Sequence, residues 1–462
     1  MKSALNTHEE EARDVSGSAS TSLDFSWDLE LSTQYLLPDS VFDLDLSPQD
    51  DYGSIEHARV SSFPRFSSHL PDINENEAEL DCIDDQSEDA MYNVQPVPWS
   101  INSNQYDDFC LRLKAEIKGN SLERSLPSRN VLSRNLESFF RCSQEQLPFI
   151  HQTSFSIVHR SVGLTLAVVT LGSLFRFEHS QAMELYKIAK AVLREWTNRE
   201  HLELSAELLS ESEDLLHDSP DELERIQTYI LLTNFASWIG PSSLPEAILM
   251  GHQLSILVMQ SRTCDSDEMP DNIDWVAWVT TEERRRTIFA AYALLNLHRI
   301  AYGNPSKLCN QDIGVCVPGT AAAWKAKSHT QWLAAPRPVE CLFQDLLSAL
   351  LEGTTLSQAT YLSAFANYVL IHGILQQMDM ECSSSTKMLS PNKMEIFERA
   401  LRAWQSSWEL TSESTLDPLS SKGPLALNAT ALFRIAYMRL LPDFHSREGF
   451  FSDMTLSHGP QL

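Results

Sequence analysis

The chain has 462 residues, of which 43% are hydrophobic and 21% charged, and its 63 acidic against 35 basic residues give a formal net charge of −28. This hydrophobic fraction is ordinary for a globular core with additional polar sequence. The charge argues against direct binding of nucleic acid, because acidic groups repel the phosphate backbone, and the low count of 15 glycines disfavours a Rossmann-type cofactor domain.

Residues 1–129 are predicted to form a disordered acidic arm, and residues 130–462 a helical domain. Ser, Asp, Glu, Asn and Pro dominate the arm, and the first 100 residues of the chain hold 22 acids and four bases. Their net charge is −18, which leaves −10 for the other 362 residues. Small islands of apolar residues cannot bury enough surface to offset the entropy of the chain.

Two segments of the arm alternate acidic and apolar residues: LDFSWDLEL at 23–31 and VFDLDL at 41–46. Period two is the pattern of a half-buried strand, but Asp and Glu are poor strand formers and no third strand pattern lies nearby. The composition is typical of activation segments, whose bulky groups dock in a coactivator groove, and it also suits an inert solvating tail. In the activation interpretation, which we favour, the anchors are Phe25, Trp27, Leu29, Phe42 and Leu46.

The arm also contains Asp84-Asp85-Gln86-Ser87-Glu88, a spacing with which all-helical terpene synthases hold Mg²⁺ through carboxylate oxygens. These acids lie in low-complexity sequence rather than on an apolar helix, and no second metal motif follows. Histidine pairs flanking a glutamate, nucleophile elbows and glycine-rich phosphate loops do not occur either. We therefore predict no catalytic residue and no enzyme activity.

From about residue 130 the chain reads as successive helices, which predicts an irregular all-α fold. Val162 to Phe175 is an apolar run, too short to span a bilayer, and predicts a buried helix. Ser219, Pro220 and Glu222 are start signals for a helix that Gly240-Pro241 ends. Further helices are expected at 245–260, at 274–301 as the longest, and near 338–351, 355–379, 391–410 and 424–441, with a Ser-rich loop at 380–390.

The helix at 274–301 carries an ion pair inside an apolar stripe. At 3.6 residues per turn, one face presents Trp275, Trp278, Val279, Glu282, Arg286, Phe289 and Ala293. Because the stripe continues on both sides of Glu282 and Arg286, we predict a buried pair rather than a solvated one. The run Arg284-Arg285-Arg286 is a weak import or phosphate signal, and we expect it to support the core.

The eight cysteines are Cys82, Cys110, Cys142, Cys264, Cys309, Cys316, Cys341 and Cys382, and no two are closer than seven positions. This spacing predicts neither a disulfide framework nor a zinc module. Cys309 and Cys316 lack two further ligands for a closed zinc site, and we expect packed thiols. The polar, acidic N-terminus is unlike a secretion signal, so reduced cysteines in the nucleus or cytosol are expected.

Several segments in a fixed order resemble one known family. They are residues 147–155 (LPFIHQTSF), residues 225–228 (RIQT), the run from Trp275 to His298, Gly303-Asn304-Pro305, Pro318, Trp324 and Trp332. Together they resemble the middle homology region of the fungal-specific transcription factor family over about residues 130–441. This region is most similar to the same region in members with paired Cys-Cys-His-His zinc fingers. His151, within the first segment, is expected to be structural.

The resemblance implies a nuclear transcription regulator that contacts RNA polymerase II coactivators and commonly controls a metabolic or secondary-metabolite gene set. It implies DNA binding through a zinc module, but the ligands are absent here, so we expect no cofactor and DNA contact only through a partner. Two positions depart from the family pattern: Leu295 stands where many members have Asp, and Asn304 where many have Arg. The end of the chain 22 residues after Leu440 suggests a C-terminally truncated member.

The sequence therefore predicts a fungal-type transcription regulator with an acidic arm and a helical regulatory domain, and without its own DNA reader. That domain would restrain or expose the arm in response to a partner or a small-molecule effector, and a homo- or heterodimer is compatible with it. The alternatives are a small-molecule-binding or pathway protein on the same scaffold and, third, a helical terpenoid-type enzyme. No membrane association is expected.

Overall fold

The computed structural model describes residues 97–440, apart from 98, 118–125, 144, 208–219, 262–272, 306, 337–339, 357–361, 385–388, 418–419 and 421. The chain divides into two compact units, Met1–Ala90 and Met91–Leu462, and all described residues belong to the second. Most of the predicted arm, including its five anchors and Asp84-Asp85, therefore lies outside the described residues.

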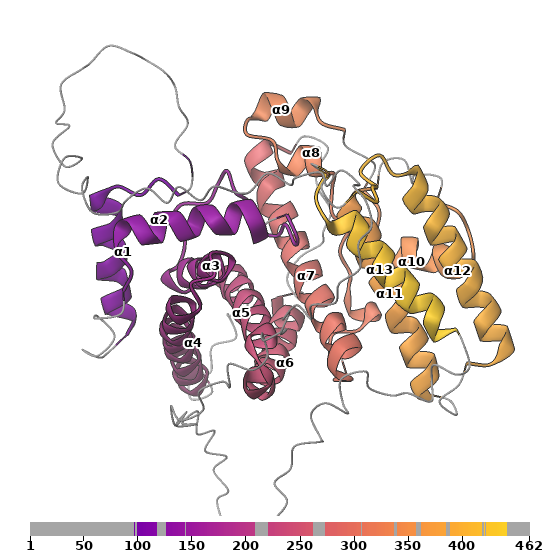
Figure 1. Cartoon of the computed structure of the whole chain (residues 1–462), viewed down its shortest axis with the longest axis horizontal. Coiled ribbons are helices and arrows are strands. Elements are labelled where there is room, and N and C mark those ends of the chain that lie inside the picture. The colour runs from indigo at the N-terminus through magenta and orange to yellow at the C-terminus, as the bar shows by residue number, and fades with distance from the viewer. Residues whose placement is uncertain are drawn as a thin grey trace, which may run out of the picture. The chain divides into compact units, whose positions relative to one another are not determined.

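The described residues form thirteen α-helices (Figure 1), which confirms the predicted all-α class. Their only bridge of strand type is an isolated one between Cys316 and Leu342. The first helices are α1 (Ser103–Glu116), α2 (Arg129–Ser138), α3 (Val162–Phe175), α4 (His179–Glu207), α5 (Pro220–Ile239) and α6 (Leu244–Ser261). They are followed by α7 (Trp275–Tyr302), α8 (Ala321–Trp324), α9 (His329–Ala334), α10 (Phe343–Leu351), α11 (Ala364–Ser384), α12 (Pro391–Leu410) and α13 (Leu425–Arg439). No described helix is long and apolar enough to cross a membrane.

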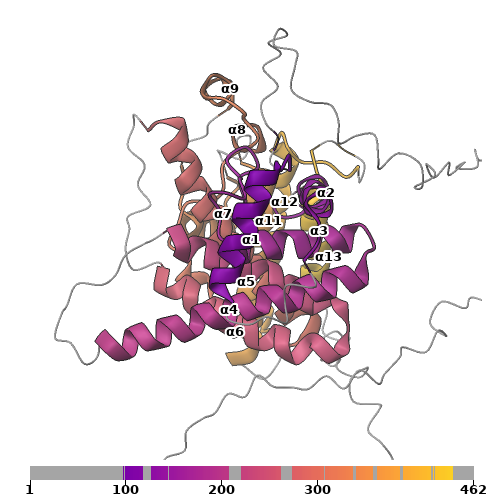
Figure 2. The ribbon, with the colours of Figure 1, turned by 90° about the vertical axis from the view of Figure 1, so that its left-hand side faces the viewer.

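Helix α3 is the centre of a first group of helices and packs against α2, α4 and α5. It has the predicted bounds and is buried from Val162 to Ser173. Ser161 caps it, because its hydroxyl accepts a hydrogen bond from the Leu164 N–H at 3.3 Å. Each large aliphatic side chain buried here stabilises the fold by about 1.5–3 kcal/mol. In Figure 2 this first group faces the viewer, with α4 as its long helix.

Helix α7 stands between α3–α6 on one side and α10–α13 on the other (Figure 1). It packs against α5 and α6 on one side and against α11 on the other. The Asp274 carboxylate accepts from the Ala277 N–H at 2.7 Å, and Gly303 ends the helix at a φ of 67°. Both ends follow local rules, because a carboxylate caps free N–H groups and glycine adopts positive φ without steric cost.

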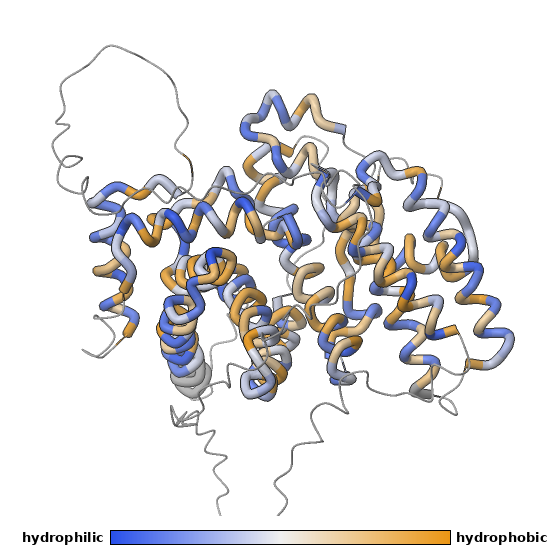
Figure 3. The backbone as a smooth tube through the Cα atoms, viewed as in Figure 1, coloured by the Kyte–Doolittle hydropathy of each residue, from blue (hydrophilic) through white to orange (hydrophobic). Residues whose placement is uncertain are grey.

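A second group is formed by α10 to α13, with α11 at its centre. Hydrophobic and hydrophilic residues alternate along α12 (Figure 3), whose buried face includes Phe397, Leu401 and Trp404. The indole N–H of Trp404 donates to the Asn367 carbonyl of α11 at 3.0 Å. This hydrogen bond satisfies a buried polar group and sets the depth of the aromatic ring.

Three parts of the sequence prediction differ from the structure. Helix α1 lies within the predicted disordered arm, because Asn102 and Gln105 form a capping box and Phe109 and Leu113 are buried. Helix α11 runs through Ser384, five residues into the predicted loop at 380–390. Helix α4, with 29 residues against 28 in α7, was not predicted and is the longer of the two.

His372 of α11 provides a test by pH. It is fully buried, neither ring nitrogen has a hydrogen-bond partner among the described residues, and burial lowers the pKa of its imidazole to about 3. Because a histidine in the unfolded chain has a pKa of about 6.5, the unfolded state binds more protons below that pH, and stability falls as the pH falls. We expect the loss of unfolding free energy between pH 7 and pH 5 to be about 1–2 kcal/mol smaller in His372→Leu than in the parent.

Urea unfolding followed by circular dichroism at the two pH values measures this difference. The exposed His329 supplies the control, His329→Leu, which should keep the pH dependence of the parent. Equal pH dependence in His372→Leu and the parent would contradict a neutral buried imidazole.

Candidate functional site: the polar centre of α7

The centre of α7 holds the predicted ion pair. The Arg286 Nε donates to the Glu282 Oε1 at 2.6 Å, and the two side chains are 2% and 1% exposed. Glu282 and Arg286 are four residues apart, so one turn of helix brings them together. The structure buries Trp278 and Phe289 on the same face and leaves Trp275 partly exposed.

The other hydrogen-bonding groups of the pair reach two loops. Arg286 donates to the Gly319 carbonyl at 2.7 Å and to the Pro148 carbonyl at 3.2 Å, and the Gly319 N–H donates to Glu282 at 2.8 Å. The guanidinium also lies 4.4 Å from the ring centroid of Trp324 in α8, a cation–π distance. The pKa of Glu282 is raised, because desolvation outweighs the opposite effects of Arg286, Arg285 and the Gly319 N–H. These contacts favour the carboxylate form and so reduce the cost of burying it.

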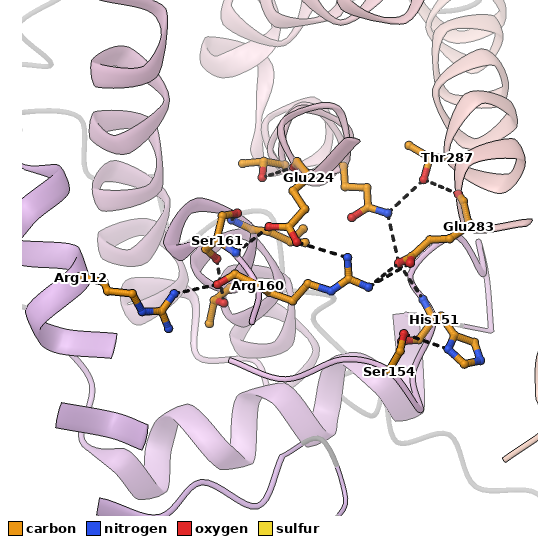
Figure 4. A network of polar contacts seen from close by, with 12 residues as sticks. Arg112, His151, Ser154, Arg160, Ser161, Glu224, Glu283 and Thr287 are labelled. Carbon is orange, nitrogen blue, oxygen red and sulfur yellow. Dashed lines mark hydrogen bonds and ion pairs between the residues drawn. The ribbon is translucent and has the colours of Figure 1, made fainter. Parts of the chain in front are cut away.

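Glu283, the next residue, makes a second set of contacts (Figure 4). Both of its carboxylate oxygens accept from the Arg160 guanidinium at 2.9 Å, and Oε1 also accepts from the backbone N–H of His151 at 3.1 Å. Such a two-point contact fixes the orientation of both groups. It joins α7 to the segment that precedes α3.

Arg160 also bonds to Glu224 of α5, at 3.3 Å. The other Glu224 oxygen accepts from the backbone N–H of Ser161 at 2.6 Å, at the start of α3. Burial opposes the charge of Arg160, but Glu283 and Glu224 more than offset that effect, so its pKa is raised. The network in Figure 4 therefore ties α3, α5 and α7 together at one point.

All three arginines of the run 284–286 contact the protein itself. Arg285 is buried and makes two 2.9 Å hydrogen bonds to the carboxylate of Glu340, and Arg284 donates to the Ser261 carbonyl at 2.5 Å. Arg286 is paired with Glu282. These contacts support the interpretation that the run stabilises the core.

The remaining candidates from the sequence are His151, which lies beside this centre, and the cysteines Cys309 and Cys316. His151 is buried; burial, Arg286 and Arg160 lower the pKa of its ring to about 4, although the backbone of Trp324 acts in the opposite direction. Its Nδ1 lies 3.0 Å from the Ser154 hydroxyl, and its ring packs edge-on against Trp324. Cys309 is partly buried and Cys316 is buried, and neither forms a disulfide among the described residues. Within the described ranges, no group of three or more His, Cys, Asp or Glu side chains could hold a metal ion.

Sequence reasoning did not identify Arg160, Glu224 or Glu283 as parts of this site. Arg160 and Glu283 are 123 residues apart, and Arg160 and Glu224 are 64 apart, so no local pattern relates them. The acidic residue adjoining Glu282 was the available signal, because a buried second carboxylate needs a partner of its own.

Comparisons with known proteins cover the same region. A family profile described as the fungal specific transcription factor domain matches residues 136–406. The zinc finger protein zas1 of Schizosaccharomyces pombe is 21% identical over 285 residues, which are 59% of this chain and 30% of that protein. The chain thus spans less than a third of that relative's length. No solved structure matches the chain.

Proposed function

The chain belongs to the family that carries the fungal-specific transcription factor domain, and on this premise we propose that it regulates a metabolic or secondary-metabolite gene set. The observation that carries the proposal is the family match from residue 136 to residue 406, which includes the polar centre of α7. That centre supports a scaffolding role, because its charged groups are paired with one another and with backbone groups.

The acidic arm is the part that we propose to contact the transcription machinery in the nucleus. Residues 1–100 carry a net charge of −18 from 22 acids and four bases, and bulky apolar residues alternate with acids in two short segments. Charge keeps such residues in water until a coactivator groove accepts them. We propose that the helical domain controls the availability of the arm in response to a partner or ligand.

We propose that these 462 residues reach DNA through a partner protein. The net charge of −28 supports this, because it opposes approach to a phosphate backbone. The spacing of the eight cysteines in the printed sequence also supports it, since no two are closer than seven positions.

A reporter assay tests the activation segment. Residues 1–100, fused to an unrelated DNA-binding domain, are expected to activate a reporter gene. The triple variant Phe25→Ala, Trp27→Ala, Phe42→Ala should lower that activity by about tenfold or more, because truncating an aromatic anchor in a groove commonly costs about 2 kcal/mol.

The control keeps the charge and removes apolar residues elsewhere. Val60→Ala, Ile73→Ala, Ile83→Ala alters three residues outside the two alternating segments, and its activity should stay close to that of the parent. An inactive parent fusion would remove the activation proposal. Equal activity of the two triple variants, with both fusions present at equal levels, would show that the aromatic residues are not the anchors.

A further inference from the structure

A cavity of about 660 Å³ adjoins the polar centre of α7. Its walls come from the segment before α1, residues 145–153, α7, α8, the start of α11 and the chain between α12 and α13. The lining residues that matter for its chemistry are Trp99, Phe140, Trp324, Phe365, Lys327 and Lys422. The volume lies within the range of about 300–1,000 Å³ that is typical of small-molecule sites.

Four aromatic residues line part of the cavity. Phe140, Trp324 and Phe365 are buried by the fold and Trp99 is half-buried, yet all four border this space. They come from four separate segments of the chain and give that part of the wall an apolar character. An aromatic or alicyclic group can bury its surface against them, in offset or edge-on contact.

Most charged groups in the walls already have partners of their own. Arg286 is paired with Glu282, and Glu145 with Lys325 at 2.8 Å. The Glu413 carboxylate accepts one backbone N–H from Ala321 and another from Ala364, both at 2.7 Å. Those two N–H groups lie at the starts of α8 and α11, where a negative charge is favourable.

Two lysines are left without a carboxylate partner among the described residues. Lys422 donates to the Ser412 carbonyl at 2.8 Å, which leaves its charge uncompensated, and no described side chain pairs with Lys327. Both are exposed and line the cavity. The rim is thus positive in a chain of net charge −28. A positive rim attracts a negatively charged ligand group.

We infer that this cavity is a binding site for a small organic acid with an aromatic or alicyclic body. The body packs among the four rings, and the anionic group lies at the rim near Lys327 and Lys422. The bound acid contacts α7, α8 and α11 together, and therefore stabilises the arrangement that Arg286 already holds. The binding itself does not depend on the proposed function, whereas its role as an effector rests on it.

Two fluorescent probes that differ by one charged group test the site in the full chain. 8-Anilinonaphthalene-1-sulfonate has an aromatic body and an anionic group, and N-phenyl-1-naphthylamine has the same body without the sulfonate. Ala321→Trp places a large side chain in the cavity wall. It should lower the affinity for both probes by about tenfold or more, because the added ring occupies the space. Ala322→Trp is the control, since the neighbouring Ala322 is exposed and does not line the cavity, and its affinities should stay within about twofold.

Charge reversal at the rim tests the anionic preference. The double variant Lys327→Glu, Lys422→Glu should lower the affinity for the sulfonate probe by about tenfold. The affinity for the uncharged probe should change by less than about twofold. Lys307→Glu reverses an exposed lysine that does not line the cavity, and both affinities should be retained. These three exposed lysines can be changed without altering the core, so the test holds even if Ala321→Trp fails to fold.

The outcomes separate the inference from the proposed function. If folded Ala321→Trp bound both probes as tightly as the parent, the probes would bind elsewhere on the surface, and the inference that this cavity is the site would be overturned. The anionic preference would be overturned if the lysine double variant lowered the affinity of both probes equally. It would also be overturned if the double variant lowered the affinity of neither probe. Because the binding assay contains no DNA or coactivator, an inactive reporter fusion would leave its result intact.

Discussion

Glu282→Ala is expected to lower the free energy of unfolding by about 3–5 kcal/mol, because it leaves the Arg286 guanidinium as an uncompensated buried charge. The Arg286 side chain is 2% exposed, so its charge is balanced by this carboxylate and by backbone acceptors rather than by bulk water. The Gly319 N–H loses its acceptor at the same time, which adds the cost of an unsatisfied donor. Denaturant unfolding at pH 7, followed by circular dichroism, measures the change.

The chain contains a matched control with the same residue types, order and spacing. Glu398 and Arg402 form an i,i+4 pair on α12, but their side chains are 45% and 70% exposed. Glu398→Ala should therefore cost less than about 1 kcal/mol. A similarly small loss in Glu282→Ala would show that the pair in α7 does not hold the core together.

The double variant Glu282→Leu, Arg286→Met separates charge from packing. Replacing both charges with apolar groups removes the buried unpaired charge, so this variant should be more stable than Glu282→Ala alone. The hydrogen bonds from Arg286 to the Gly319 and Pro148 carbonyls are also lost. Stability below that of the single variant would show that those loop contacts outweigh the charge effect.

Gly172→Ala is expected to lower the free energy of unfolding by about 3 kcal/mol, because the added methyl group would overlap the backbone of α2. A Cβ at this position would lie 1.9 Å from the Asn135 carbonyl oxygen and 2.7 Å from its carbon. The side chain of Asn135 also donates to the Ser173 hydroxyl at 2.6 Å. Relief of the overlap moves α2 away from α3 and stretches this hydrogen bond.

The expected loss of stability is opposite in direction to the usual effect of this substitution in a helix. An alanine in place of glycine within a helix otherwise stabilises by about 0.5–1 kcal/mol. Gly314→Ala is the control, because a Cβ there meets no atom within 4 Å, and its stability should change by less than about 0.5 kcal/mol. A gain in stability for Gly172→Ala, by the same unfolding measurement, would show that α2 adjusts at little cost.

Local signals in the sequence were sufficient for much of the helical structure. Pro220 and Asp274 mark helix starts, Gly303 marks a helix end, and the apolar run from Val162 to Phe175 is α3. Helix starts and ends depend on caps and on backbone preferences, which act over four or five residues. The burial of Glu282 and Arg286 was predictable for the same reason, because helical periodicity places both within the apolar stripe.

Where the sequence prediction went wrong, the deciding contacts come from distant parts of the chain. Helix α1 lies in a region of polar composition, and it is stabilised by Phe109 and Leu113, which belong to the same core as α3. The overall composition of a segment does not show which distant residues its few apolar side chains pack against.

The sequence by itself determined the all-α class, several helix boundaries and the helix face that carries the buried ion pair, because each depends on residues within a few turns of one another. Only the tertiary structure decided that Arg160 and Glu224 complete the polar centre, that Glu413 bridges the starts of α8 and α11, and that four aromatic residues from separate segments line one cavity. These residues are distant from their partners in the sequence. They meet because long-range packing brings their helices together, and local periodicity does not indicate such packing.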